Sequence, residues 1–556
     1  MPKSRVQKSI LNARVSFIFY ILTLACTFFS RTIFLKSLGS NFLGLVGTLQ
    51  NILGLMNLAE LGLGAAISFA LYKPLQENRK NAISDIISLF GFFYKKIGAF
   101  VFGAAIILSA FFPLIFRNSP ISYGVVYSAF YAFLISSLLS YFVNYTQILF
   151  VADQKNYLVA AYFQTANILK ILLQMALARK YGNPYIWIAV ELAFGILYSL
   201  ILRWKVRRVY PWLKTCTRNG AALKRQYPDI LIRTKQVFIH KIKDFLLMQS
   251  DQIFVFAFDS LSMVAYYGNY TLITTRITGL FTTTMDSITA GIGNLIAEGN
   301  RQKILSVFWE LMAFRYFLAG IIVFCCYHLI NSFISLWLGS EYILENSIVV
   351  LLMIYVFIMI TRGTVDMFNT AFGLYADTWA AWTEVILNVG ITLSTAFYLG
   401  INGILLGKII STSLIIALWK PYYLFSRGLR ASYLLYWKKT FPLLLAFAIS
   451  YAAFHFISKP FLTLFPGHSS SFGSWLSYAV CLCAPFSVCY GILLLCISQG
   501  ARDLLRRLPS QLRPSGATKK TEEHSPQIQH RHYQPEQPGR VGKNRPKRHQ
   551  TGMRRL

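Results

Sequence analysis

Residues 38–75 read LGSNFLGLVGTLQNILGLMNLAELGLGAAISFALYKPL, a stretch whose only formally charged side chains are Glu60 and Lys73. A helix of about 20 apolar residues is long enough to cross the hydrocarbon core of a bilayer, so we predict a membrane span over residues 42–71. The apolar residues do not alternate with polar ones, which argues against a barrel strand and favours a helix. Small residues let membrane helices approach closely or bend; here they are Gly39, Gly44, Gly47, Gly54, Gly62 and Gly64.

The composition of the whole chain agrees with a membrane protein. It has 556 residues, of which 55% are hydrophobic and 13% charged, whereas soluble proteins carry about 25% charged residues. The formal net charge of +33 falls in short clusters between apolar runs and in the C-terminal tail. This is the pattern of membrane topology, and we expect no nucleic-acid partner. The eight cysteines form no CxxC pair, so we expect free thiols and no metal site.

Apolar runs long enough for a span recur along the chain and predict an all-α polytopic protein with about 14 transmembrane helices. The runs cover residues 15–37, 42–71, 96–116, 122–150, 157–178, 184–203, 238–258, 262–295, 306–336, 346–374, 381–399, 402–426, 440–458 and 473–498. If both termini are cytoplasmic, Lys and Arg concentrate in the cytoplasmic loops, as the positive-inside rule requires. The first run continues past Cys26, so we interpret it as a retained span and not as a cleaved signal peptide.

Two segments outside the spans organise the chain. The basic connection over residues 205–237 separates the first six spans from the remaining eight. Residues 499–556 are basic, rich in Pro, Gln and His, and poor in apolar side chains. Such a segment cannot build a core, so we predict a disordered cytoplasmic tail.

Charged residues inside the predicted spans indicate a water-filled cavity. Each costs about 2.5–3.5 kcal/mol to insert, so such side chains face a protein interior or water. Both signs are present among them. They are Arg31, Glu60, Lys170, Glu191, Asp244, Asp251, Arg276, Asp286, Glu310, Arg315, Arg362, Asp366, Glu384 and Lys408.

Asp251 lies in the otherwise apolar run DQIFVFAF and has two interpretations. It forms a structural ion pair with a neighbouring helix, or it titrates or binds a coupling cation, H⁺ or Na⁺, in the cavity. Glu60 and Asp366 are the competing candidates for ion coupling. Arg362 and Asp366 are spaced i, i+4, so they share a helix face and neutralise one another.

No catalytic constellation is present. The sequence has no GxSxG, HExxH or Walker motif, and GLG at residues 62–64 follows no strand and lacks the third glycine of a nucleotide loop. We therefore expect a protein that is not an enzyme, with no catalytic residues, cofactor or metal. Transport without an ATPase module must use an ion gradient, the membrane potential or the substrate gradient.

Four stretches in order resemble the Wzx-like polysaccharide flippases, which belong to the exporter superfamily that includes the MATE transporters and the lipid II flippases. The first is residues 38–75. The others are ADQKNY (152–157), DQIFVFAFDSLSMVAYYGNYTLI (251–273) and GLYADTWAAWTEVILNVGITLSTAFYLGINGILLGKIIS (373–411). The resemblance covers residues 10–430 and does not extend to the last two spans or the tail.

The resemblance implies two six-helix lobes related by a pseudo-twofold axis. They correspond to an N-terminal lobe over residues 1–204 and a C-terminal lobe over residues 238–430. Two additional spans follow over residues 431–498. Parallel repeats of this kind are a known plan of membrane transporters.

The resemblance also implies a substrate, an oligosaccharide linked to undecaprenyl pyrophosphate and moved to the periplasmic leaflet. Arginine suits pyrophosphate because its guanidinium donates paired hydrogen bonds. Arg31 and Arg276 match the cavity arginines that lipid II flippases carry on the first and eighth spans. The second span offers Gln50 and Asn51 in place of an arginine, and Arg362 completes the candidate site. Lys408 departs from the small residue expected in its motif.

Two alternatives stand beside the flippase. One is a drug–cation antiporter of the MATE kind, which favours an acidic, aromatic cavity. The other is a membrane-bound enzyme such as an O-acetyltransferase or polysaccharide polymerase, which needs larger outer loops. The flippase interpretation places the chain in the bacterial cytoplasmic membrane, with membrane lipids, the lipid-linked glycan and the polysaccharide polymerase machinery as partners.

Overall fold

The fold comes from a computed structural model of the chain. It describes residues 5–56, 63–153, 155–217, 220–226, 247, 250–374, 377–464 and 471–512. These residues form helices and turns, and no β-strand occurs among them. The predicted all-α fold is confirmed.

Two breaks among the helices of residues 5–226, which we call the N-terminal group, fall at glycines. Gly39, at φ +84°, separates the first two helices, and Gly182, at φ +57°, ends α8 in the left-handed conformation that glycine adopts without strain. Asn183 then caps α9 by accepting from the Tyr185 N–H. The group comprises α1 (Arg5–Leu38), α2 (Ser40–Met56), α3 (Leu63–Gln76), α4 (Lys80–Ala110), α5 (Phe112–Ile115), α6 (Tyr123–Phe142), α7 (Ile148–Ala152), α8 (Asn156–Tyr181), α9 (Pro184–Val209) and α10 (Gly220–Gln226).

The helices of residues 250–497 form the C-terminal group, which begins with a helical segment over residues 250–258. Between α17 and α19 the chain runs through two π-helical stretches on either side of α18. The elements are α12 (Leu261–Ala297), α13 (Arg301–Trp337), α14 (Asn346–Thr361), α15 (Gly363–Ala371), α16 (Thr378–Leu399), α17 (Ile401–Thr412), η5 (Ser413–Trp419), α18 (Lys420–Tyr423), η6 (Leu424–Gly428), α19 (Tyr433–Leu464) and α20 (Phe472–Ile497).

Ten helices of the described chain are long and apolar enough to cross a membrane, which identifies a multi-pass membrane protein. Four of the expected spans are not among the ten: residues 42–71, 157–178, 238–258 and 262–295. The first and third contain residues outside the described part of the chain. The other two are α8 and α12, which are long helices that carry many polar side chains.

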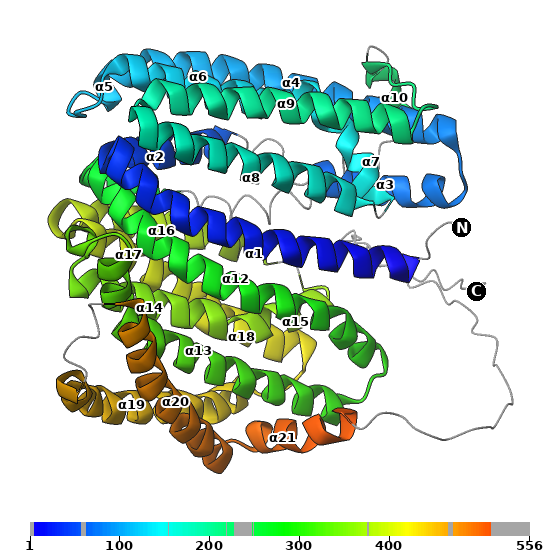
Figure 1. The fold of residues 1–556 in the computed structure, drawn as a ribbon. Helices are drawn as coiled ribbons and strands as arrows, with labels where there is room; N and C mark the ends of the chain where they lie inside the picture. The colour runs from blue at the N-terminus through cyan, green and yellow to red at the C-terminus, as the bar shows by residue number, and fades with distance from the viewer. Residues whose placement is uncertain are drawn as a thin grey trace, which may run out of the picture. The chain divides into compact units, whose positions relative to one another are not determined.

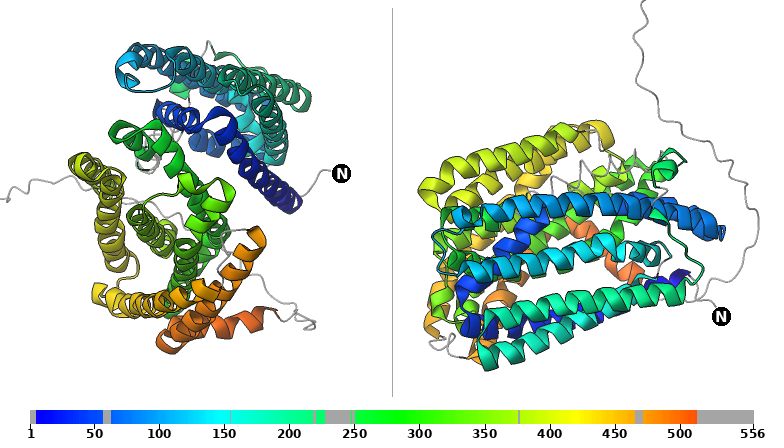
Figure 2. Two further views of the ribbon diagram at one scale, coloured as in Figure 1. Left: turned by 60° about the vertical axis from the view of Figure 1, so that its left-hand side comes forward. Right: turned by 90° about the horizontal axis from the view of Figure 1, so that it is seen from above.

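The two groups of helices meet along α1, α2 and α12 (Figures 1 and 2). Helix α1 packs on α8 of its own group, and α2 packs on α12 of the other group. A Cβ added to Gly44 of α2 would lie 1.7 Å from the Leu261 carbonyl oxygen at the start of α12. The two backbones therefore touch at this point, and glycine permits the contact.

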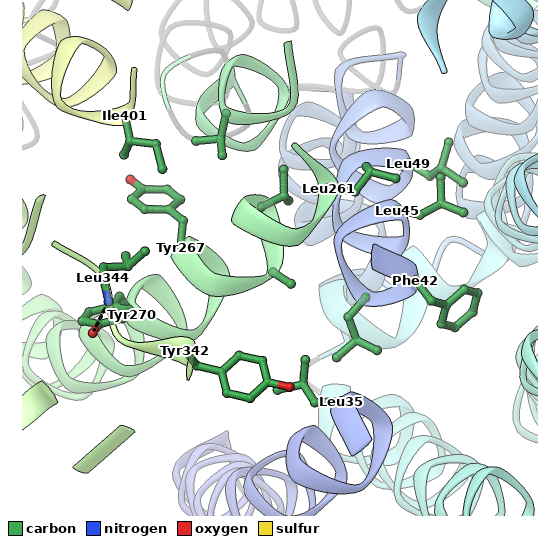
Figure 3. Close-up of a cluster of buried hydrophobic side chains, with 14 of the residues drawn as sticks. Leu35, Phe42, Leu45, Leu49, Leu261, Tyr267, Tyr270, Tyr342, Leu344 and Ile401 are labelled. Atoms are coloured by element: carbon green, nitrogen blue, oxygen red, sulfur yellow. Dashed lines mark hydrogen bonds between the residues drawn. The ribbon is translucent and has the colours of Figure 1, made fainter. Parts of the chain in front are cut away.

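A cluster of buried apolar side chains surrounds this junction (Figure 3). Leu45, Leu49 and Leu261 are fully or almost fully buried there. The hydroxyl of the buried Tyr270 accepts a hydrogen bond of 3.0 Å from the Leu344 N–H. The cluster fixes α12 against the loop that precedes α14.

The two additional C-terminal helices pack on α13 and on each other. The Phe486 ring of α20 stacks on the Phe324 ring of α13 at 3.8 Å. The Tyr490 hydroxyl donates to the Tyr316 carbonyl across 3.0 Å. The first part of the expected disordered tail is helical as well, because α21 runs over Gln499–Leu512.

Candidate functional site

A cavity of about 600 Å³ lies among helices of both groups. Its walls come from α1, α2, α8 and α9 of the N-terminal group, and from residues 250–258, α12, α14 and α17 of the C-terminal group. In transporters built from two repeats, the substrate site lies at the interface between the repeats. Five charged side chains line the cavity: Arg31, Lys170, Lys408, Glu191 and Asp251.

Arg31 of α1 reaches across the junction to α12. Its Nε donates to the Asn269 Oδ1 across 2.6 Å, and its Nη2 donates to the Ala265 carbonyl oxygen across 2.9 Å. Neither acceptor carries a formal charge, and Arg31 contacts no carboxylate in the described part of the chain. Among the described residues, Arg31 is therefore held in place by neutral acceptors and its positive charge has no carboxylate partner.

Asp251 forms an ion pair with Lys408 of α17. Both residues are buried, at 8% and 7% exposure, and two tyrosines enclose them. The Tyr267 hydroxyl lies 3.4 Å from the Asp251 Oδ2, and the Lys408 Nζ lies 4.4 Å from the centre of the Tyr355 ring. The ion-pair interpretation of Asp251 agrees with this geometry, while its role in ion coupling stays a prediction.

A second ion pair faces the cavity from the N-terminal group. The Lys170 Nζ of α8 lies 2.7 Å from the Glu191 Oε1 of α9. The Gln174 Nε2 donates to the other carboxylate oxygen across 3.0 Å and to the Trp187 carbonyl across 3.2 Å. The Glu191 charge is thus neutralised by one lysine and stabilised by one amide.

Neutral polar groups occupy much of the remaining wall. Threonines of α12 face the cavity at the three- and four-residue steps of a helix. Carboxamides of three other segments line it too: Gln50, Asn51, Asn167, Gln174 and Gln252. The described lining residues include three cations and two anions, and so contribute one excess positive charge.

Solved structures share this arrangement of helices. The lipid II flippase MurJ in its inward closed conformation superposes with a TM-score of 0.62 at 15% identity, covering 89% of this chain and all of MurJ. An inward-facing multidrug-resistance MATE transporter of the MOP superfamily gives 0.53 at 14% identity, over 76% of this chain and 98% of that one. The chain shares the fold of these two proteins.

The other comparisons gave lower similarity or no match. A MATE structure in the bent conformation gives a TM-score of 0.50 at 15% identity, over 77% of this chain and 99% of that one. No model of a protein family matches the sequence. No curated protein matches it either. The solved structures described above are those of a flippase and of transporters.

The fold brings three residues of the predicted substrate site together at the cavity. Arg31, Gln50 and Asn51 all line it. Asn51 donates from Nδ2 to the Gly47 carbonyl across 2.8 Å and to the Gln252 Oε1 across 2.7 Å. The amide pair with Gln252 links α2 to the segment at residues 250–258.

The other predicted site residues lie elsewhere. Arg276 is not among the lining residues, and its guanidinium carbon lies 5.9 Å from the centre of the Tyr20 ring on α1. Arg362 sits between α14 and α15, where its Nε lies 3.4 Å from the Asp366 Oδ2, as the i, i+4 spacing predicts. Glu60 lies outside the described residues.

Sequence reasoning had not joined Lys170 to Glu191 or placed Gln252 and Asn269 at the site. A signal existed on α8, where Asn167, Lys170 and Gln174 recur at helical spacing on one face. No comparable signal marks Asn269, which stands out only through its contact with Arg31. Among the described residues, no group of three or more His, Cys, Asp or Glu could hold a metal ion.

Proposed function

We propose that this protein is a flippase for a lipid-linked oligosaccharide that carries a pyrophosphate group. It turns the glycolipid from the cytoplasmic to the outer leaflet of a bacterial cytoplasmic membrane by alternating access, without ATP. The glycan serves a surface polysaccharide, such as an O-antigen, capsule or exopolysaccharide. Both termini are cytoplasmic in this proposal, and the polymerase that extends the glycan acts on the product.

The main support for the proposal is the charge of Arg31, which no carboxylate among the described residues neutralises. The other two cations of the cavity are each paired with a carboxylate, so Arg31 provides the excess positive charge. A guanidinium in a site of low dielectric attracts a phosphate strongly and donates several hydrogen bonds to it. An anionic cargo neutralises the cavity, whereas a cationic cargo adds to its charge.

The amides and hydroxyls of the wall support a sugar as the second part of the cargo. Carboxamides present both donors and acceptors, which matches the mixed donors and acceptors of sugar hydroxyls. A sugar leaving water needs such partners, because a buried polar group without a hydrogen bond costs free energy. The cavity offers them beside the cation.

The pairing of both lining carboxylates speaks against the drug–cation antiporter. A cavity for an organic cation needs a carboxylate that is free to bind it. Glu191 and Asp251 are each engaged by a lysine. Ion coupling by Asp251, Glu60 or Asp366, and contributions of Arg276 and Arg362 to pyrophosphate binding, remain part of the proposal.

Flipping in proteoliposomes tests the proposal. The substrate is a fluorescent oligosaccharide on undecaprenyl pyrophosphate, and an impermeant quencher measures the fraction that crosses the bilayer. We expect Arg31→Ala to reduce the initial rate at least about tenfold, because it removes a charge-assisted contact of about 1.5–3 kcal/mol. Arg31→Lys keeps the charge and should retain partial activity.

The same proteoliposome assay provides the control and the results that would contradict the proposal. Arg79→Gln changes an exposed arginine outside the cavity, in a surface ion pair with Glu77, and should flip at the wild-type rate or within about twofold of it. Efflux of a cationic dye is measured in parallel. Dye transport without glycolipid flipping would overturn the flippase and favour the antiporter, and flipping by Arg31→Ala at the wild-type rate would remove the observation that supports the proposal.

A further inference from the structure

A gap in the cavity wall lies over Gly268 of α12. Gly268 lines the cavity, and a Cβ built on it would lie 3.3 Å from the Arg31 Nη2 and 3.9 Å from the Gln252 Nε2. The absence of a side chain at this position therefore leaves room for one atom between two nitrogen donors. The donors come from α1 and from the segment at residues 250–258, so three parts of the chain frame the gap.

Both donors are oriented by other residues. Asn269 and the Ala265 carbonyl hold the Arg31 guanidinium from the same turn of α12 that contains Gly268. Asn51 donates to the Gln252 Oε1, so the carboxamide of Gln252 must turn its Nε2 away from Asn51. That Nε2 donates to no acceptor among the described residues. Asn51 is thus a positioning residue for the Gln252 donor.

The chemistry of the gap selects an anionic oxygen. Two nitrogen donors converge on it, one of them charged, and both carboxylates among the described lining residues, Glu191 and Asp251, are engaged by lysines. Oxygen atoms of a phosphate accept several hydrogen bonds and match this donor pair. A neutral hydroxyl can also accept hydrogen bonds here, but only an anionic oxygen neutralises the guanidinium charge as well.

We propose that the gap over Gly268 is the subsite for a phosphate oxygen of the cargo, held by Arg31 and Gln252. The proposal rests on the proposed function, since it assumes that the cargo carries a phosphate. It goes further in naming the place where the phosphate sits and the residues that leave room for it. The headgroup of an ordinary anionic phospholipid has the same chemistry, so the experiment must separate the two sources.

Gly268→Ala fills the subsite with one methyl group. The contact that it makes is with the end of the flexible Arg31 side chain, and alanine is a better helix former than glycine, so thermal stability should not fall. Gly279→Ala is the matched control, because it lies on the same helix and its Cβ would meet nothing within 4 Å. Both variants keep every charge of the cavity.

Binding is measured with the full-length protein in nanodiscs of neutral phospholipid. The probes are undecaprenyl pyrophosphate, undecaprenol and phosphatidylglycerol, each followed by native mass spectrometry. We expect the pyrophosphate to bind best and Gly268→Ala to weaken its binding about tenfold or more, since a charge-assisted contact is lost. Gly279→Ala should bind as the wild type does, and undecaprenol should not distinguish the variants.

Each outcome decides one question. Wild-type binding by Gly268→Ala together with weak binding by Arg31→Ala would overturn the subsite and leave the proposed function standing. Wild-type binding by both variants would overturn the function as well. Equal binding of phosphatidylglycerol and undecaprenyl pyrophosphate would assign the gap to a phospholipid headgroup instead of the cargo. If Gly268→Ala proves unstable, Gln252→Met removes one donor without changing α12, and unchanged binding by that variant overturns the subsite.

Discussion

Two ion pairs face the same cavity, one in each group of helices, and their surroundings differ. Lys170 and Glu191 have side-chain exposures of 19% and 16%, and Gln174 supplies a further hydrogen bond to the carboxylate. Lys408 and Asp251 are at 9% and 11%, enclosed by Tyr267 and Tyr355. We call the first, which is more exposed, the accessible pair, and the second, which is more deeply buried beside Tyr267 and Tyr355, the sealed pair.

This difference in burial indicates which ion pair is a fixed part of the structure. The free energy of separating two charges rises as the surrounding dielectric falls, so the sealed pair resists opening far more than the accessible one. A solvated pair exchanges its partner for water with little loss. We therefore expect Asp251 and Lys408 to link α17 to residues 250–258 permanently, and Lys170 and Glu191 to rearrange when cargo enters.

The largest effect should follow the loss of one member of the sealed pair. Lys408→Met leaves the Asp251 carboxylate buried without a partner, and we expect the free energy of unfolding to fall by about 3–5 kcal/mol. The double variant Lys408→Met with Asp251→Asn removes both charges and should recover most of that loss. Denaturant unfolding in detergent micelles measures both. A double variant no more stable than the single one would show that the pair is not the source of the effect.

The double variant also tests ion coupling. It lacks the Asp251 carboxylate but is expected to fold, so its flipping can be followed with and without an imposed proton or sodium gradient. Transport that still responds to the gradient would exclude Asp251 and shift the role to Glu60 or Asp366.

A smaller effect is expected at the accessible pair. Glu191→Gln leaves Lys170 with cavity water and the new amide, and we expect a loss of about 1 kcal/mol in the free energy of unfolding. The same unfolding assay provides the comparison with Lys408→Met. A loss as large as that of Lys408→Met would mean that both pairs are equally sealed.

The smallest effect should come from the basic residues that follow α21 in the sequence. Truncation after Leu512 keeps α21 and removes the basic residues beyond it. We expect a change below about 0.5 kcal/mol in stability and a wild-type rate of flipping. Loss of flipping with normal membrane insertion would assign the removed residues a specific role.

The sequence predicted the helices well because span length and hydrophobicity are local properties. Charged residues inside spans, such as Arg31 and Asp251, also predicted a cavity, because their cost in hydrocarbon can be recognised from the local sequence. Partners could not be predicted, because Lys408 lies 157 residues from Asp251 and Asn269 lies 238 from Arg31. Arg276 shows the reverse case: it is on the expected helix, yet its orientation around the helix axis places it against Tyr20.

The backbone contact at Gly44 has a mechanical consequence. At Gly44, α2 meets the backbone of Leu261, and the polar links beside the contact are two hydrogen bonds of Ser262, to Ser40 and to Asn41. Neutral hydrogen bonds of this kind contribute about 0.5–1.5 kcal/mol each. At this point the two groups of helices are therefore joined by a backbone contact and weak hydrogen bonds, and any side chain in place of the glycine hydrogen would wedge α2 and α12 apart.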